Sequence, residues 1–226
     1  MDSKEYWKQN AAMPKGRLKG DQWLPRHIEN IPPNANVLEL GCGEGYDTQY
    51  LLSKGCKVIS TDLSQDHLDK TKETILRMPK VIGETIDSQL MLLDLTSETD
   101  WKKFADSCYD VVVASLCLHY FTPQQTRQII KEIKRVLKPN GKLFARINST
   151  NDLEHGANDG TPIENENNFR LTKDGTKRFF NKHDIQKFFG QFGGIDTAVE
   201  RTELYGRKQT KKVLWEISAT SDKLID

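Results

Sequence analysis

Three glycines at alternate positions, Gly41, Gly43 and Gly45, follow a short apolar run over residues 37–40. Glycine has no β-carbon, so a backbone that contains it can turn tightly and approach a ligand closely. A helical stretch begins directly after the last glycine, at residue 46, and free N–H groups at a helix start are donors for a polar or anionic ligand. The spacing predicts a strand, a binding loop and a helix that together cradle a ligand.

Asp62 stands at the end of the next apolar run, residues 57–61. A carboxylate at the end of a second strand is placed to accept hydrogen bonds from both vicinal hydroxyls of a ribose, as in nucleoside-binding doubly wound sheets. Two details separate this pattern from a plain dinucleotide fingerprint. The glycine spacing is G-x-G-x-G, and Glu39 lies inside the strand, two residues before Gly41.

These residues resemble the first motif and the acidic second-strand end of the class I S-adenosylmethionine-dependent methyltransferases. The resemblance continues in order through residues 92–95, 109–121 and 136–143, and so covers about residues 37–148. It implies an α/β fold with a doubly wound, Rossmann-like, seven-stranded and mostly parallel sheet, an antiparallel C-terminal hairpin, and helices on both faces. It also implies S-adenosylmethionine as cofactor, S-adenosylhomocysteine as product, and methyl transfer as the activity.

The resemblance implies cofactor contacts at the matching positions. Asp94 is expected to accept a hydrogen bond from the adenine amine, while Leu63 and the Leu95 backbone flank the ring. A turn or capping role is the alternative for Asp94. The expected cofactor-binding residues are Trp7, Glu39, Gly41, Cys42, Gly43, Gly45, Asp62, Leu63, Asp94, Leu95 and Ser115.

The N-terminal leader, residues 1–36, carries two adjacent aromatic residues, Tyr6 and Trp7. Such a leader often lies over the cofactor and acceptor openings in the family, where aromatic faces shield the sulfonium. The alternative is that these rings fasten the leader to the sheet. The two interpretations stay open from the sequence.

His119 follows the fourth expected strand, where a base would help an acceptor that must lose a proton. The alternative is a histidine that packs against, or caps, the helix start at Thr122. His155 is a second candidate. Displacement at an activated methyl group needs alignment above all, so no metal and no covalent nucleophile is expected.

Residues 149–180 form an insert that we expect to cover the acceptor site, as a long polar loop to residue 168 and a short hairpin around Gly175. Four side chains could hold a carboxylate or another anionic acceptor, with the solvated surface as their alternative: Arg146, Asn148, Arg170 and Arg178.

The composition favours one domain over residues 1–226 and a small-molecule acceptor. Thirty-three basic and 32 acidic residues give a net charge of +1, so no global field attracts nucleic acid or an anionic membrane.

The four cysteines form no C-x-x-C pair, which favours free thiols in a reducing compartment over a metal site. No apolar run has the length of a signal or membrane segment, so we expect a cytoplasmic protein without a membrane partner. The basic cluster at residues 207–212 is expected to be a solvated hairpin tip.

The elements that must position these residues alternate along the chain. We expect helices near residues 22–28, over 46–53 and 65–78 (with Ser64 as N-cap), from Thr122 onward, and over 182–192. Strands are expected over residues 57–63, 89–95, 109–118, 142–148, 196–205 and 211–219.

Two other functions compete with methyl transfer. An NAD(P)-linked oxidoreductase would share the glycine loop and Asp62, but it leaves Glu39, Asp94 and residues 118–120 unexplained. A protein of the same fold that binds the cofactor without transferring a methyl group is the second. The oligomeric state and the acceptor atom stay open.

Overall fold

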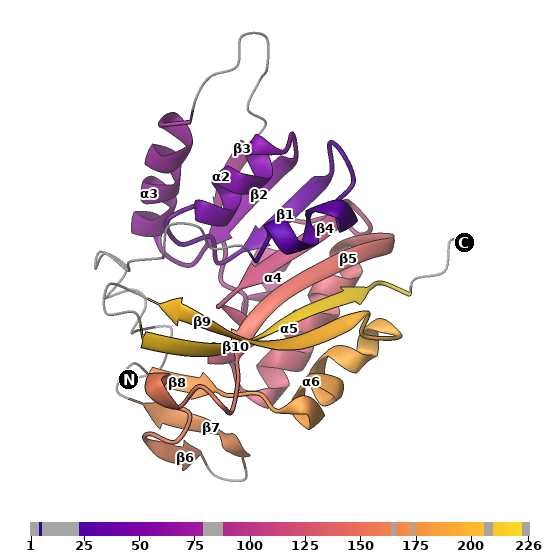
Figure 1. Cartoon of the computed structure of the whole chain (residues 1–226). Coiled ribbons are helices and arrows are strands. Elements are labelled where there is room, and N and C mark those ends of the chain that lie inside the picture. Colours follow the sequence, from indigo (N-terminus) through magenta and orange to yellow (C-terminus); the bar gives the residue numbers. More distant parts are fainter. Residues whose placement is uncertain are drawn as a thin grey trace.

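Seven strands form one twisted sheet in the order β3-β2-β1-β4-β5-β10-β9 (Figure 1). The computed structural model describes residue 5 and residues 23–78, 88–163, 166–172, 175–205 and 210–222. The strands are β1 (Asn36–Leu40), β2 (Lys57–Asp62), β3 (Ser88–Leu92), β4 (Tyr109–Ser115), β5 (Leu137–Asn148), β9 (Thr197–Tyr205) and β10 (Thr210–Thr220). Strands β1 to β5 pair in parallel, whereas β10 runs antiparallel to β5 and β9. The expected mostly parallel sheet with an antiparallel C-terminal hairpin is confirmed.

Helices cover both faces of this sheet. They are α2 (Tyr46–Ser53), α3 (Gln65–Leu76), α4 (Glu98–Trp101), α5 (Pro123–Val136) and α6 (Lys182–Phe189), with 3-10 turns η1 (Pro25–Asn30), η2 (Leu118–Tyr120), η3 (Leu153–His155) and η4 (Gly190–Phe192). One buried apolar cluster joins α4, α5 and α6 to the sheet, and another joins α2 and the segment before β1 to its opposite face. Because both faces are covered, β4 is an almost continuous apolar run, as expected for a central parallel strand.

Helix α5 begins at the predicted capping box. The Thr122 hydroxyl accepts from the Gln125 N–H, the Gln125 side chain accepts from the Thr122 N–H, and Pro123 occupies the first turn. The helix ends at Val136 and β5 starts at once, earlier than the expected residue 142. Residue 138 precedes a proline, which disfavours helical backbone there, so the chain is already extended before the turn.

Other boundaries differ by a few residues. β3 ends at Leu92 and leaves Asp94 in the following turn, and β4 ends at Ser115 because residues 118–120 form η2. Helix α3 stops at Leu76, and Ser64 precedes it without a side-chain capping hydrogen bond. The expected helix over residues 182–192 divides into α6 and η4, and the expected one near residue 22 is the 3-10 turn η1.

The insert contains more regular structure than expected. Strands β6 (Thr161–Ile163), β7 (Glu166–Thr172) and β8 (Gly175–Arg178) form a separate antiparallel sheet in the order β6-β7-β8, below the main sheet in Figure 1. The hairpin of β7 and β8 was predicted, but β6 was not. The small sheet is tied to the main sheet where Phe180 N–H donates to the Asn148 carbonyl at 2.8 Å.

Tyr6 and Trp7 lie outside the described residues, so their predicted contacts stay predictions. Within the described ranges, we find no helix with both the length and the apolar character that a membrane crossing requires.

Candidate functional site

The glycine loop joins β1 to α2 at the carboxyl edge of the sheet. Gly41, Gly43 and Gly45 all have positive φ angles, of 68°, 58° and 79°. A β-carbon on Gly41 would lie 2.7 Å from the Cys117 β-carbon, so that position requires glycine. A β-carbon on Gly43 would meet no atom within 4 Å, so the loop there borders open space that a ligand can occupy.

Asp62 ends β2 beside this loop, and three donors fix its carboxylate. Oδ2 accepts from the Gly43 N–H at 3.0 Å. Oδ1 accepts from the Ser64 N–H at 3.0 Å and lies 3.1 Å from Nδ1 of His67. The side chain keeps 11% exposure. The carboxylate is thus held in one orientation while part of it still faces the cavity.

The turn after β3 supplies the third part of this edge. Asp94 accepts from the N–H and the hydroxyl of Thr96 at 3.0 and 2.7 Å, which is the turn role weighed as its alternative. It lines the cavity nonetheless, between Leu93 and Leu95. The Leu95 carbonyl accepts from the Trp101 indole at 2.9 Å, which fixes the backbone of the turn.

One cavity of about 650 Å³ runs along this edge, a volume within the range of small-ligand sites. Eight residues of the expected cofactor set line it: Gly41, Cys42, Gly43, Asp62, Leu63, Asp94, Leu95 and Ser115.

Glu39 and Gly45 belong to the support of the loop rather than to the cavity wall. Glu39 is 2% exposed, and its Oε2 accepts from the hydroxyls of Thr48 and Ser60 at 2.5 and 2.9 Å. Gly45 is the N-cap residue of α2, and a β-carbon there would lie 2.8 Å from the Thr71 side chain. Glu39 thus joins β1 to β2 and α2, and Gly45 allows α2 and α3 to pack closely.

His119 is also absent from the described cavity wall, where its neighbours Tyr120 and Phe121 stand instead. It is 2% exposed, and its ring centroid lies 4.2 Å from that of Tyr120. Burial, with smaller effects of Lys212 and Lys177, holds the pKa of His119 well below its ordinary value. The ring is therefore neutral and packed, as in the alternative interpretation, and its role as a base stays a prediction.

The far end of the cavity is aromatic and comes from distant segments. η2 and the residue after it give Tyr120 and Phe121, β7 gives Phe169, and β9 gives Tyr205. The described wall is completed there by Ile163 and Thr176 from the small sheet and by Arg146 from β5. The insert therefore forms part of the wall, where a cover for an acceptor was expected.

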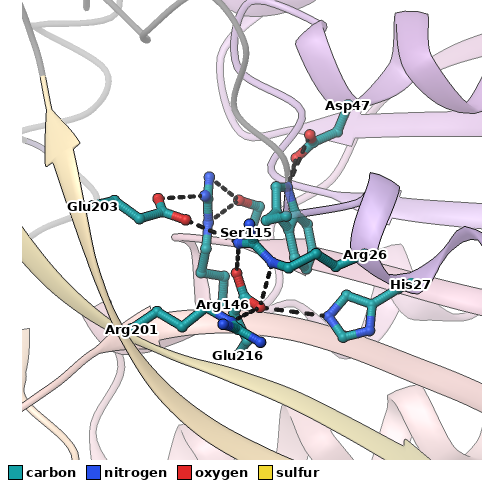
Figure 2. A network of polar contacts seen from close by, with 9 residues as sticks. Arg26, His27, Asp47, Ser115, Arg146, Arg201, Glu203 and Glu216 are labelled. Atoms are coloured by element: carbon teal, nitrogen blue, oxygen red, sulfur yellow. Dashed lines mark hydrogen bonds and ion pairs between the residues drawn. The ribbon is translucent and has the colours of Figure 1, made fainter.

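Arg146 belongs to a network of charged side chains on one face of β5, β10 and β9 (Figure 2). It is 2% exposed, its Nη1 donates to Glu203 at 3.0 Å, and its Nε and Nη2 lie 3.3 and 3.2 Å from the Ser115 hydroxyl. Its guanidinium also lies over the Trp23 ring, 5.1 Å from the centroid. These contacts hold a permanent positive charge at the wall of the cavity.

The segment before β1 is fastened to the same region. The Trp23 indole donates to both oxygens of Asp47, a cavity-lining residue of α2, at 3.0 and 3.1 Å. Arg26 pairs with Glu203 and with the buried Glu216 of β10. Trp23 thus fastens this segment to α2 at the cavity, and Arg26 fastens it to β9 and β10.

Arg178 anchors the small sheet and does not line the cavity. It is fully buried, donates to Glu166 at 2.7 Å, and lies 4.9 and 5.0 Å from the ring centroids of Phe169 and Phe188. Its Nε and Nη2 have no hydrogen-bond partner among the described residues. The other anion-binding candidates lie off the wall as well. Arg170 donates to backbone carbonyls of residues 158–160, and Asn148 is buried within β5.

His155 of η3 lies next to the start of β10, to which Lys212 belongs. His155 Nε2 is 3.1 Å from the Thr210 hydroxyl, and burial lowers the pKa of His155. Lys212 was expected at a solvated hairpin tip, but it is 9% exposed, with its Nζ 3.5 Å from Asp152. Residues 149–155 bond to the start of β10, and Asp152 among them contacts this lysine, which charge alone did not reveal.

The described cysteines are free, and burial raises the pKa of Cys42 and of Cys117. Among the described residues, no group of three or more histidine, cysteine or acidic side chains is arranged to hold a metal.

Several cavity-lining residues were missed in the sequence: Tyr46, Asp47, His67, Phe169, Thr176 and Tyr205. His67 could have been found, because it lies in the first turn of the expected helix that follows Asp62, and the start of that helix is at the carboxyl edge of the sheet. Tyr205 carries no such signal, since its position depends on how the C-terminal hairpin pairs with the sheet.

Comparisons with known proteins agree with this geometry. Residues 37–141 match a family model described as a methyltransferase domain. A tRNA N(3)-methylcytidine methyltransferase of Schizosaccharomyces pombe is 23% identical over 222 residues, 92% of this chain and 70% of its own length. A thiol S-methyltransferase of Mus musculus is 34% identical over 119 residues, 53% of this chain and 45% of its own.

A solved SAM-dependent methyltransferase from Methanosarcina mazei has the same fold, with a TM-score of 0.71 at 24% identity over 89% of this chain and 98% of its own. The chain spans about half the length of curated relatives such as the mouse enzyme. Residues 37–141 thus match a methyltransferase domain, and the seven-stranded sheet has the fold of that solved methyltransferase.

Proposed function

We propose that the protein transfers a methyl group from S-adenosylmethionine to a small-molecule acceptor held in the same cavity. The observation that carries this proposal is the continuity of the cavity. It runs from the glycine loop and Asp62 to the aromatic wall around Tyr120 and Tyr205. An in-line transfer requires that donor and acceptor lie side by side, as they can in one continuous cavity.

The residues present fit the adenosyl cofactor. The open space at Gly43 admits a ligand against the backbone, the fixed Asp62 carboxylate suits two ribose hydroxyls, and Leu63 and Leu95 offer apolar surfaces for a flat base. When bound, the cofactor supplies a methyl group on an already activated sulfur. The protein's own task is then to orient the two ligands and to exclude water.

The aromatic end suits this task. Tyr120, Phe121, Phe169 and Tyr205 present large, rigid surfaces that orient an acceptor and keep water away. Arg146 adds a positive charge, and its contacts with Ser115 and Glu203 fix the orientation of the guanidinium. This arrangement suits a carboxylate or another anion. We infer an acceptor that combines an apolar or aromatic body with a polar or anionic group.

A second acceptor class has one specific observation in its favour. The yeast relative described as a tRNA methyltransferase aligns with 92% of this chain. The matched thiol S-methyltransferases, the small volume of the cavity and the net charge of +1 favour a small acceptor instead. A nucleotide of tRNA is therefore the competing acceptor.

The test is a transfer assay with two substrate pools, a metabolite extract and total tRNA. Each is incubated with protein and S-adenosylmethionine, and mass spectrometry follows a gain of one methylene unit. We expect the gain on a metabolite. A methylated tRNA nucleoside with an unchanged metabolite pool would overturn the small-molecule assignment.

A further inference from the structure

His67 is a buried histidine of α3 that faces the Asp62 carboxylate. Its Nδ1 lies 3.1 Å from Asp62 Oδ1, and the two side chains keep only 8% and 11% exposure. An ionised carboxylate can only accept hydrogen bonds, so Nδ1 carries the hydrogen in this contact. His67 also lines the cavity, so the contact lies within the site.

Two threonines follow His67 on the same face of α3, at i+4 and i+7. The Thr71 hydroxyl donates to the Gly43 carbonyl at 3.0 Å, and the Thr74 hydroxyl donates to the Glu44 carbonyl at 2.9 Å. One polar stripe of α3 therefore holds both parts of the cofactor end, the glycine loop through its carbonyls and Asp62 through its carboxylate.

The three donors on Asp62 differ in kind. The Gly43 and Ser64 N–H groups belong to the backbone, so the fold of the chain places them whatever the side chains are. The His67 imidazole is the side-chain donor among them. A carboxylate with fixed donors on both oxygens loses little rotational freedom when a ribose binds, and this favours affinity.

We propose that His67 is a positioning residue of the cofactor site, which fixes the Asp62 carboxylate in the orientation that the ribose hydroxyls need. The inference rests on the proposed function, because it takes Asp62 as the ribose ligand. It assigns His67 no contact with the reacting atoms.

The test compares two substitutions by calorimetric titration with S-adenosylhomocysteine. His67→Leu removes the donor and should weaken binding about tenfold or more, as expected for a lost hydrogen bond to a charged group. His67→Asn keeps an amide N–H near the place of Nδ1 and should stay within about threefold of the wild type. The control is His183→Leu, a change at an exposed histidine of α6, which should leave affinity unchanged.

A double-mutant cycle separates positioning from general support of the fold. In an Asp62→Ala background, adding His67→Leu should change affinity by less than about twofold, because the side chain that His67 orients is already gone. Equal losses in both backgrounds would overturn the proposal, since a structural role would act in either. Thermal unfolding verifies that each variant is folded, and His67→Gln, with a misplaced donor, replaces His67→Leu if that variant does not fold.

The outcomes distinguish this proposal from the function it rests on. Wild-type protein that binds S-adenosylhomocysteine, together with His67→Leu that binds it equally well, overturns the role of His67 alone. Wild-type protein that does not bind the compound overturns both.

Discussion

The two ends of the cavity are built in different ways. The cofactor end uses residues between 41 and 95 and positions them through backbone geometry and one face of α3, as in the backbone donors on Asp62 and the α3 hydroxyls that bond to the glycine loop. The acceptor end draws on segments from residue 115 to residue 205 and relies on side chains, such as Arg146 held between Ser115 and Glu203. A local motif can specify the first end, whereas only the complete fold specifies the second.

The contrast predicts that substitutions at the two ends change different quantities. Changes at the cofactor end should alter the Kd of S-adenosylhomocysteine. Changes at the acceptor end should alter stability or acceptor kinetics while cofactor affinity stays nearly constant. A variant that violates this division would show that the two ends are coupled.

The largest effect is expected where the small sheet is anchored. Glu166→Ala leaves the Arg178 guanidinium buried without its carboxylate partner and should lower the free energy of unfolding by about 3 kcal/mol, measured by urea denaturation. Lys187→Ala is the matched control. Its Nζ lies 3.9 Å from the same Glu166 and is more exposed, so the loss should stay below about 0.5 kcal/mol. Equal losses in the two variants would refute the buried anchor.

Asp62→Ala should weaken binding of S-adenosylhomocysteine by about 2 kcal/mol or more, because hydrogen bonds from the ribose to a charged group are lost. The change in Kd is measured by calorimetry. Asp66→Ala, four residues further along at an exposed site of α3, serves as the control and should leave the Kd unchanged. A folded Asp62→Ala protein with wild-type affinity would remove Asp62 from the site.

His119 links stability to pH. Because burial lowers its folded-state pKa, the unfolded chain, with an ordinary pKa near 6.5, binds a proton that the folded protein does not. The contribution of His119 to the free energy of unfolding is therefore complete above about pH 6.5. It decreases as the pH falls below that value, by up to about 1.4 kcal/mol per pH unit. His27 and His155, whose pKa values are also lowered by burial, act in the same direction.

His119→Leu should therefore reduce the difference in unfolding free energy between pH 7 and pH 5. Urea denaturation at both values measures it, and an unchanged difference would contradict a neutral, buried ring. The turnover of the same variant tests the base role. A lower kcat at pH 7 with unchanged cofactor affinity would support His119 as a base.

The smallest effect is expected at Arg146. Arg146→Met removes the charge at the aromatic end and should lower kcat/KM for the acceptor about fivefold, a loss of about 1 kcal/mol. Cofactor Kd should stay within about twofold. Steady-state kinetics with the identified acceptor, beside calorimetry, measures the two quantities. A large loss of cofactor affinity would instead place Arg146 at the cofactor end.

The sequence predicted those elements whose signals are local. Helix α2 has the predicted bounds, and the Thr122 capping box forms as expected, because both depend on residues within one turn of each other. β6 was missed because a three-residue segment with a proline has no strand signal of its own and exists through its pairing with β7.

The residues of the site likewise divide into those that a local motif predicts and those that only long-range pairing places. The cavity wall includes eight residues of the expected cofactor set, because the motif places them at the ends of adjacent parallel strands. Tyr205 and Phe169 reach the wall through the pairing of β9 with β10 and of β7 with β8, which local patterns do not encode. Lys212 shows the same limit, since its burial depends on Asp152, 60 residues away.

The most direct measurement is a pair of calorimetric titrations of the wild-type protein, one with S-adenosylhomocysteine and one with NAD. Our account predicts saturable binding of the first compound and no heat from the second. Saturable binding of NAD without binding of S-adenosylhomocysteine would contradict it and favour an oxidoreductase.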